Sequence, residues 1–454
     1  MPRTIRIRDT LTGELRELEP RDPGRVGIYA CGPTVYARIH VGNARPYVVF
    51  TLFKRFLEHE GYGVEFVANI TDVNDKIYDA AREAGVPSHE LAGEMTRYYV
   101  EDTDRLGLGR PDDEPKASET IGPIVELIRD LIDSGHAYAA GGDVYFRVAS
   151  DPDYGKLSNR SLDEMDQGEP DDRSDLKEAP QDFALWKAHK PGEDTSWESP
   201  WGRGRPGWHI ECSAMAEQLL GLDFDVHGGG SDLIFPHHEN EIAQTESARG
   251  RPLARIWMHN GIVRLEGEKM AKSVGNIRLL AGALDEYGRD ALIMYFVSGH
   301  YRQPLVYTED ALADARGAIE RVRDFVLRLD ADAGVPPEAG EYAERFYAAL
   351  ADDFNTPAAR AALFDWITEA NRRIDAGARI GPGPLPQMLR VLGLENLLEA
   401  GEKPDDDALR LLEEREDARR SKDFATADVR RAELAARGWT VRDTPDGPQL
   451  VRQR

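Results

Sequence analysis

A chain of 454 residues is too long for one hydrophobic core, so roughly two to four domains are expected. With 41% hydrophobic and 31% charged residues, and without a run of about 18 apolar residues, the composition predicts a globular protein that does not span a membrane. The two cysteines argue against a disulfide framework, and the first residues lack the apolar stretch of a signal peptide, so we expect a cytoplasmic protein. A net charge of −25 counts against nucleic-acid binding by the chain as a whole.

The first predicted βα unit has the features of a phosphate-binding site. A short β-ribbon (5–8 and 15–18) precedes an apolar strand over 26–30, which breaks at Cys31-Gly32-Pro33-Thr34. Helical patterning begins after Gly42, within His40-Val41-Gly42-Asn43, a variant of the His-x-Gly-His signature. Helix starts attract anions, and ligands of open α/β sheets bind at the carboxyl ends of the strands. We therefore expect a nucleotide at this junction.

The following segments predict a parallel sheet that is interrupted by an insertion. A second β-type run over 64–70 completes a βαβ unit and ends in the polar sequence Asn69-Ile70-Thr71-Asp72. Helical patterning continues to residue 134. Residues 139–205 are rich in Asp, Gly, Pro and Ser, and one short strand, over 143–148, is predicted there. This composition indicates an insertion between two halves of the sheet.

The rest of the chain predicts the second half of the sheet, a helical bundle and a small C-terminal module. Strands are expected over 224–227 and 256–263, and a helix opens at 236–241 with Pro236 in its first turn. Long amphipathic helices follow from 308 to about 398, then a linker over 400–407, a helical pair over 409–438 and a β-hairpin over 439–451. From residue 415 to 454 ten Lys/Arg stand against seven Asp/Glu, and this local charge of +3 is compatible with a nucleic-acid contact in the tail.

Two cysteines, a histidine and a glutamate form a candidate metal site. His237 and Glu241 are four residues apart on a predicted helix, so their side chains point from one face. Cys31 and Cys212 each lie next to a predicted catalytic segment, and two thiolates, an imidazole and a carboxylate suit tetrahedral Zn²⁺. The residues alone leave another interpretation open, because unpaired cysteines are most often buried as small hydrophobic side chains and His237 would fit an ordinary polar helix face.

Seven short motifs, in order between residues 31 and 273, closely resemble those of the cysteinyl-tRNA synthetases, a family of class I aminoacyl-tRNA synthetases, and the resemblance as a whole runs nearly end to end. They are Cys31-Gly32-Pro33-Thr34-Val35-Tyr36, His40-Val41-Gly42-Asn43, Asn69-Ile70-Thr71-Asp72, Gly207-Trp208-His209-Ile210-Glu211-Cys212-Ser213, His227-Gly228-Gly229-Gly230-Ser231-Asp232, Phe235-Pro236-His237-His238-Glu239-Asn240-Glu241 and Lys269-Met270-Ala271-Lys272-Ser273. Each motif alone is weak, whereas their common order is very specific. The resemblance implies an α/β fold: a Rossmann-type parallel sheet with an insertion, followed by a helical bundle and a small C-terminal α/β module.

The resemblance also divides the chain into segments. Residues 1–138 and 206–260 would form the two halves of the Rossmann catalytic domain, and residues 139–205 the connective insertion between them. Residues 261–307 would hold the loop of the second signature motif (KMSKS in the family) and contact the tRNA stem. Residues 308–399 would form the helical bundle and residues 400–454 the anticodon-binding module.

The activity that the resemblance implies is the ATP-dependent ligation of L-cysteine to tRNA-Cys by a monomer. The cysteine carboxylate would attack the α-phosphate of ATP, Mg-pyrophosphate would leave, and the 3′-terminal adenosine of the tRNA would accept the cysteine from the adenylate. One Zn²⁺ per chain would coordinate the substrate thiolate and so reject serine. The metal ligands would be Cys31, Cys212, His237 and Glu241.

The family pattern assigns substrate contacts as well. Around the bound cysteine it places Gly32, Thr34, Thr71 and Trp208. The catalytic residues would be His40, Asn43, Lys269 and Lys272, with the lysines on the ATP phosphates. Further ATP contacts would be Gly42, Gly230 and Asp232, and the backbone near Val263 would hold adenine.

Three residues depart from the family pattern. Asn43 stands where the first signature has its second His, Ala271 replaces the Ser of the second signature, and Pro46 occupies a position that usually holds Thr. None of them removes a metal ligand or a signature lysine, so we expect activity, with an effect on the rate alone.

Two other functions would share most of these residues. A ligase that joins cysteine to glucosaminyl-inositol in mycothiol synthesis would keep the zinc and adenylate chemistry but lack the Lys/Arg-rich tail. A non-catalytic RNA-binding paralogue would have lost part of a signature, yet His40, Lys269 and Lys272 are all present.

The tail offers candidate contacts to the tRNA anticodon. Trp439 could stack on a base, with Arg430, Arg431 and Arg442 near phosphate. The better-supported interpretation of Trp439 is structural, as a hairpin residue that caps a small core.

Overall fold

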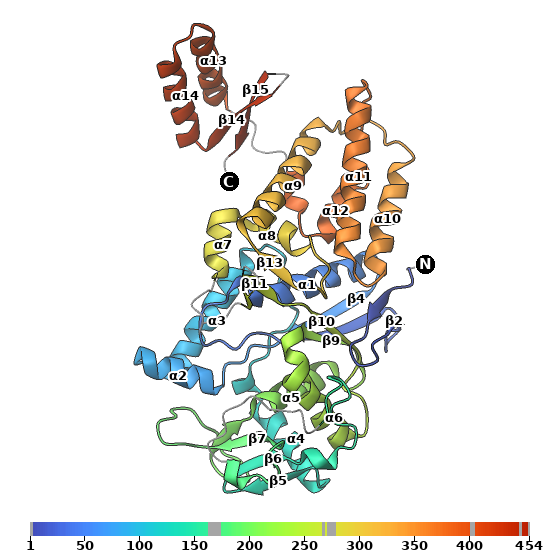
Figure 1. Ribbon diagram of the computed structural model, residues 1–454, viewed down its shortest axis with the longest axis vertical. Helices are drawn as coiled ribbons and strands as arrows, with labels where there is room; N and C mark the ends of the chain where they lie inside the picture. Colours follow the sequence, from blue (N-terminus) through green and yellow to red (C-terminus); the bar gives the residue numbers. More distant parts are fainter. Residues whose placement is uncertain are drawn as a thin grey trace.

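The computed structural model describes residues 3–161, 174–265, 268–269, 278–399, 405–444 and 447–452. The molecule is elongated, with the insertion at one end, the helical bundle toward the other and the C-terminal module beyond the bundle (Figure 1). Over the described ranges, no helix has the length and apolar character needed to cross a membrane.

A four-stranded parallel sheet with the order β10-β9-β3-β4 forms the centre of the fold. Its strands are β3 (Arg25–Ala30), β4 (Gly63–Ala68), β9 (Phe224–Gly230) and β10 (Ala254–Asn260). Helix α1 (Val41–His59) connects β3 to β4, as the βαβ pattern predicted. The chain leaves β3 toward β4 on one side and returns to β9 on the other side, so the carboxyl ends of β3 and β9 form a topological switch point where ligands bind.

The insertion is more regular than the sequence predicted. Instead of one strand it contains a four-stranded antiparallel sheet. The strands are β5 (Ala137–Ala140), β6 (Asp143–Phe146), β7 (Phe183–Ala188) and β8 (Gly204–Pro206). Leu185 and Trp186 of β7 are fully buried in one core with Ile128 of α4 (Ile121–Asp133). The missed strands are short, and contacts from distant residues stabilise them, so the local composition did not reveal them.

Three other predictions need correction near the sheet. Strand β9 runs through the glycines to Gly230, three residues beyond its predicted end. The run predicted as one strand over 256–263 divides into β10 and β11 (Val263–Leu265), because the chain turns at Gly261. Pro236 lies in an irregular turn, Ile234–His238, and α6 (Glu239–Arg249) begins only after it.

A small mixed sheet lies between the central sheet and the helical bundle (Figure 1). Strand β11 pairs in parallel with β13 (Leu305–Tyr307) and antiparallel with β12 (Glu268–Lys269). The other helices before the bundle are α2 (Asp75–Ala84), α3 (Ser88–Asp104), α5 (Trp208–Leu220), α7 (Leu280–Tyr287) and α8 (Arg289–Phe296). The bundle helices are α9 (Glu309–Arg328), α10 (Ala339–Ala351), α11 (Thr356–Asp375) and α12 (Leu385–Val391).

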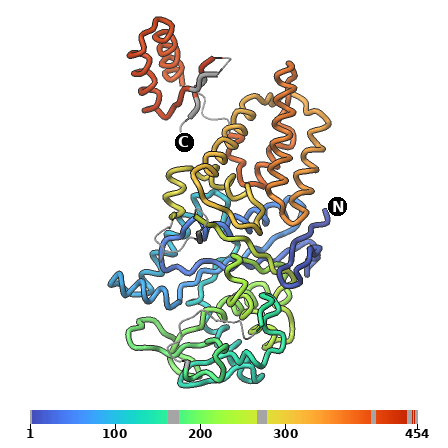
Figure 2. Tube along the Cα trace, in the orientation of Figure 1, coloured from blue at the N-terminus to red at the C-terminus, as the bar shows by residue number. Residues whose placement is uncertain are grey.

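The C-terminal module has its own hydrophobic core and stands apart from the bundle (Figure 2). It consists of α13 (Asp406–Arg420), α14 (Phe424–Ala436), β14 (Trp439–Thr444) and β15 (Gly447–Arg452). Trp439 is only 4% exposed and belongs to this core, which agrees with its structural interpretation. At the other end of the chain, β1 (Arg6–Arg8) and β2 (Leu15–Glu17) form the expected ribbon.

Candidate active site and metal centre

The four candidate metal ligands lie together at the carboxyl edge of the central sheet. Cys31 follows β3, Cys212 belongs to α5, His237 precedes α6 and Glu241 lies in the first turn of α6. One ligand atom from each residue lies within 4.8 Å of the others, and all four residues are buried. Glu241 Oε1 is 3.0 Å from His237 Nε2 and 3.5 Å from Cys31 Sγ.

Protonation in this cluster follows from its burial. Burial raises the pKa of the Cys31 thiol well above its ordinary value, and the adjacent Cys212 and Glu241 raise it further. Burial lowers the pKa of His237 to about 3, so its ring is neutral near pH 7, which is the form that binds metals. A divalent cation would compensate the acidic groups and favour the thiolates. The donor set therefore fits a tetrahedral Zn²⁺.

A second group of potential ligands shares two members with the first. His227 and His238 also place one nitrogen each within 4.8 Å of ligand atoms of Cys31 and Glu241. His227 Nε2 is 2.8 Å from Glu241 Oε2, and His238 Nε2 is 3.2 Å from Cys31 Sγ. This group contains one sulfur ligand instead of two, so it suits a thiophilic ion less well. His227 and His238 are better placed to orient the ligands than to replace His237.

Two more histidines, His209 and His259, extend the network. No role was predicted from the sequence for these two or for His227 and His238. His209 Nδ1 lies 3.0 Å from His237 Nδ1, and His259 Nε2 lies 2.7 Å from His238 Nδ1. Burial lowers the pKa of both His209 and His259 to about 3. His209, His227 and His238 all stand within the quoted motifs, so the motifs could have indicated a role for them. His259 lies outside the motifs, in β10.

The predicted cysteine-binding residues after β3 and β4 are joined along their backbones. Thr34 and Thr71 form a parallel β-bridge, and the Val35 amide donates to the Thr71 carbonyl at 3.1 Å. The Gly32 amide donates to Asn69 Oδ1 at 2.9 Å. A Cβ at Gly32 would lie 1.8 Å from the Asn69 carbonyl oxygen, so only glycine permits this approach.

Trp208 starts α5 and stacks on a metal-ligand candidate. Its ring lies 4.3 Å from the His237 ring, centroid to centroid, with an interplanar angle of 19°. Trp208 is four residues before Cys212 on the same helix, so both side chains point from one face. This geometry places an aromatic surface directly beside the cluster of candidate metal ligands.

The first signature forms a reciprocal cap at the start of α1. His40 Nδ1 accepts from the Asn43 amide at 3.3 Å, and Asn43 Oδ1 accepts from the His40 amide at 3.2 Å. Because Nδ1 accepts, Nε2 is the ring nitrogen of His40 that is left to donate. A Cβ at Gly42 would lie 2.8 Å from the His40 ring, so glycine makes room for the ring. Asn43 thus supplies the second half of a capping box at this helix start.

The remaining nucleotide candidates flank this helix start. A Cβ built at Gly42 would lie 3.9 Å from the Val263 side chain. Gly230 pairs with Asn260 in the β9–β10 register, and a Cβ at Gly230 would lie 2.5 Å from Asp232 Oδ1. The chain therefore brings both predicted ATP segments to one edge of the sheet.

The second signature is described in part. The backbone of Lys269 lies in β12, opposite Arg264 of β11. Ala271 and Lys272 lie outside the described residues, so the predictions for them stay predictions.

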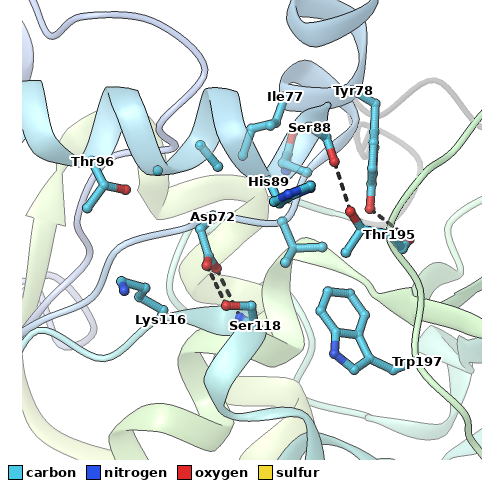
Figure 3. Close-up of a pocket in the computed structure, with 14 residues that line it drawn as sticks. Asp72, Ile77, Tyr78, Ser88, His89, Thr96, Lys116, Ser118, Thr195 and Trp197 are labelled. Atoms are coloured by element: carbon cyan, nitrogen blue, oxygen red, sulfur yellow. Dashed lines mark hydrogen bonds between the residues drawn. The ribbon is translucent and has the colours of Figure 1, made fainter. Parts of the chain in front are cut away.

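A separate cavity of about 300 Å³ lies between α2, α3 and the insertion (Figure 3). Asp72 accepts from the Ser118 amide at 3.0 Å on one wall, and Tyr78 donates to the Thr195 carbonyl at 3.2 Å on another. Among the predicted site residues that the structure describes, none lines this cavity.

Comparisons with protein families divide the chain in the same order as the structure. The class I (C) catalytic domain of tRNA synthetases matches residues 17–317, and the DALR domain matches residues 345–394. The cysteinyl-tRNA ligase anticodon-binding domain matches residues 404–452. This last match supports a cysteine–tRNA ligase over the mycothiol-pathway ligase and the non-catalytic paralogue.

Relatives that match over the full length of the chain are cysteine–tRNA ligases. The cysteine–tRNA ligase of Symbiobacterium thermophilum is 44% identical, and the match covers 99% of both chains. That of Halorhodospira halophila is 47% identical over 99% of this chain and 100% of its own.

A solved structure agrees on the fold. Methionyl-tRNA synthetase of Mycobacterium tuberculosis, in complex with methionyl-adenylate, gives a TM-score of 0.59 over 82% of this chain and 88% of its own. At 17% identity this likeness shows the fold alone. The full-length identities decide the family: the chain belongs to the cysteine–tRNA ligases, which are class I aminoacyl-tRNA synthetases.

Proposed function

We propose that the protein activates L-cysteine with ATP and Mg²⁺ to cysteinyl-adenylate, and then transfers the cysteine to the 3′-terminal adenosine of tRNA-Cys. Membership of the cysteine–tRNA ligase family supports the reaction. The observation that carries the specificity for cysteine is the buried cluster of metal ligands beside the predicted amino-acid pocket. The two buried, unpaired cysteines also support action in the cytoplasm, and the family favours a monomer.

The zinc ligands would be Cys31, Cys212, His237 and Glu241. When bound, the ion supplies a thiophilic Lewis acid that lowers the pKa of the substrate thiol and binds its sulfur in preference to the hydroxyl of serine. A pocket that senses only shape gives about 10–200-fold discrimination per small group. The ligand cluster therefore provides a chemical basis for selecting cysteine without a separate editing site.

The residues around the cluster would hold the amino acid in place. The backbone bridge between Thr34 and Thr71 fixes one wall of the proposed pocket, and Gly32 permits the close approach of the Asn69 backbone beside it. Trp208 would cover the bound cysteine, which its position against the His237 ring supports. Water exclusion by this ring would strengthen polar contacts inside the pocket.

Adenylate formation needs orientation and positive charge more than proton transfer. The start of α1 and the Nε2–H of His40 would donate to the ATP phosphates, and Asn43 would add its amide N–H groups. We assign Lys269 and Lys272 to the same phosphates on the strength of the signature motif. Cationic groups stabilise the charge that develops as the cysteine carboxylate attacks and pyrophosphate leaves.

The C-terminal module would read the tRNA anticodon. Trp439 is buried, and Arg430 is already paired with Glu414 at 2.8 Å and with Glu433 at 2.7 Å. Phe424, which is 64% exposed at the start of α14, is the better candidate for stacking on a base.

The test is the fate of radiolabelled cysteine when the purified protein receives ATP together with tRNA-Cys or glucosaminyl-inositol. We expect cysteine-dependent exchange of pyrophosphate into ATP and transfer to the tRNA alone. Transfer to the sugar alone, or no exchange at all, would refute the proposal. Metal analysis of the same preparation should find one zinc per chain.

A further inference from the structure

Arg45 is a fully buried cation in α1 whose guanidinium contacts main-chain carbonyls. Its Nη1 donates to the carbonyls of Gly261 and Ile262, at 2.6 and 3.1 Å. Its Nη2 donates to those of His300, Tyr301 and Gln303, at 3.2, 3.1 and 2.7 Å. Throughout the described part of the chain, no carboxylate forms an ion pair with Arg45.

A buried charge without a counterion is unfavourable unless its hydrogen bonds compensate it. Burial lowers the pKa of Arg45 to about 10, so the side chain still carries its charge near pH 7. Arg45 donates to five carbonyls from its two Nη atoms, and hydrogen bonds from a charged donor are stronger than those from a neutral one. The side chain therefore holds these carbonyls together strongly.

The carbonyls belong to two segments that lie unusually close. The Gly261 amide donates to the Tyr301 carbonyl at 2.8 Å, and the Leu305 amide donates to the Ile262 carbonyl at 3.0 Å. A Cβ at Gly261 would lie 2.5 Å from the Gln303 carbonyl. Several carbonyl dipoles that point at one place repel each other, so a planar cationic donor is suited to gather them.

These segments lead directly to the proposed adenine position. Val263 follows Ile262 and begins β11, which pairs with β13. The start of α1 also contacts the chain on the other side of the second signature, because the Val41 amide donates to the Arg278 carbonyl at 3.0 Å. Residues before and after the second signature are therefore both bonded to α1: Ile262 through Arg45, and Arg278 through Val41.

We propose that Arg45 is a positioning residue for ATP. It fixes the separation between the start of α1, where the phosphates would bind, and the backbone from Gly261 to Val263, where adenine would bind. Arg45 itself touches no substrate and acts through the carbonyls. This inference rests on the proposed function, because it needs ATP at this edge of the sheet.

Pro46 weakens α1 at the position next to Arg45. Proline disfavours helical backbone at the residue before it, yet Arg45 lies within α1. Pro46 also lacks an amide hydrogen, so the Gly42 carbonyl loses its usual helical partner. The five bonds of Arg45 hold the helix in place at this weak point.

Two variants test the proposal in cysteine-dependent ATP–pyrophosphate exchange. Arg45→Lys keeps the charge without the planar fork, and Arg45→Gln keeps an amide donor without the charge. For both we expect the KM for ATP to rise about tenfold or more, the equivalent of ~1.4 kcal/mol, with the KM for cysteine unchanged. An equal change of both KM values, or of neither, would overturn the proposal.

Arg289→Lys is the matched control. Arg289 also donates to main-chain carbonyls, those of Leu106 and Gly393, both at 2.7 Å, and neither partner is a predicted site residue. We expect this control to lower the Tm and leave both KM values unchanged. A KM split that also appeared in Arg289→Lys would assign the effect to general destabilisation and refute the specific role of Arg45.

A nucleotide analogue separates positioning from folding. Purine riboside 5′-triphosphate lacks the exocyclic amine through which a backbone would recognise adenine. If Arg45 positions that backbone, Arg45→Lys should raise the KM for the analogue by a smaller factor than the KM for ATP. An equal rise in KM for both nucleotides would contradict the proposal. Absence of exchange in the wild-type protein would instead refute the proposed function itself.

Discussion

His227 Nε2 lies 2.8 Å from Glu241 Oε2, while the other oxygen of Glu241 faces His237 and Cys31. The His227 ring is held by stacking on Trp257, at 4.3 Å and 18°. His227 Nδ1 has no hydrogen-bond partner among the residues that the structure describes, so the contact with Glu241 defines its polar role. A fixed imidazole thus orients the carboxylate of a metal-ligand candidate.

Replacing His227 by Phe should weaken zinc binding without removing a ligand. The phenyl ring keeps the stacking on Trp257 but cannot hydrogen-bond Glu241. Loss of such an outer partner typically costs about 10–100-fold in metal affinity, and we expect a loss in that range in chelator competition. His136→Phe is the control, because His136 bonds Ser150 in the insertion at 2.8 Å. Equal affinities in the two variants would refute the orienting role of His227.

Cys212→Ser should abolish stoichiometric zinc binding, because a hydroxyl is a far weaker zinc ligand than a thiolate. Metal analysis should fall well below one zinc per chain, and discrimination between cysteine and serine in the exchange assay should collapse. Ser213→Ala keeps all four candidate ligands and serves as the neighbouring control. A full zinc content in Cys212→Ser would exclude Cys212 from the site.

Zinc affinity should rise with pH. Burial and the adjacent acidic groups raise the pKa of Cys31 in the metal-free protein, so zinc must displace a proton that is still bound near pH 7. The pKa of His237 is about 3, so this histidine contributes no dependence between pH 5 and 8. Competition titrations across that range should show affinity increasing with each pH unit, and a flat profile would contradict a protonated Cys31.

The same shift predicts how the metal-free protein responds to alkali. A thiol with a raised pKa in the folded state contributes stability that is fully present below its unfolded pKa of about 8.5. That contribution is lost as the pH rises through the folded pKa. The Tm of the metal-free protein should therefore fall above about pH 8.5, whereas the zinc-loaded protein should resist the change.

Asn43→Asp should separate stability from catalysis. The aspartate keeps the oxygen that caps α1, and a negative charge at a helix start is favourable, so the Tm should be unchanged or higher. The same charge would repel ATP phosphates, and we expect activation to fall about tenfold or more. Asn355→Asp makes the same change at the cap of α11, where the side chain accepts from Ala358, and should leave exchange intact. A retained exchange rate in Asn43→Asp would remove Asn43 from the phosphate site.

The sequence predicted the site best at motif residues that the backbone geometry also requires. Gly32 and Gly42 stand where a Cβ would collide with Asn69 and His40, and both were recognisable because the motifs retain them. The parallel sheet followed from apolar runs alternating with a helix. The candidate metal ligands come from three separated stretches, and their residue types suggested a zinc site before the family motifs supported the same set.

What the sequence did not reveal depends on contacts between distant segments. Nothing in the local pattern distinguishes Arg45 from a surface arginine, because its partners are carbonyls more than 200 residues away. Likewise, the strands β7 and β8 are surrounded by turn residues, so only their pairing defines them. The aromatic residues of the tail were ambiguous for the same reason, since exposure depends on how the small core packs.

Phe424→Ala should impair tRNA charging and spare amino-acid activation. Phe424 is 64% exposed in a segment that matches the cysteinyl-tRNA ligase anticodon-binding domain, whereas Trp439 is buried. Stacking of a base on an aromatic ring contributes about 1–3 kcal/mol, so kcat/KM for tRNA-Cys should fall about 5–150-fold.

The matched control is Leu409→Ala, which removes another exposed apolar side chain, 49% exposed, from α13 of the same module. It should leave charging unchanged, and Phe424→Trp should restore it, because a larger ring still stacks. The ATP–pyrophosphate exchange rate should be the same in all three variants, since the module lies beyond the bundle from the catalytic sheet (Figure 1). Normal charging by Phe424→Ala would show that base recognition depends on other residues of the module.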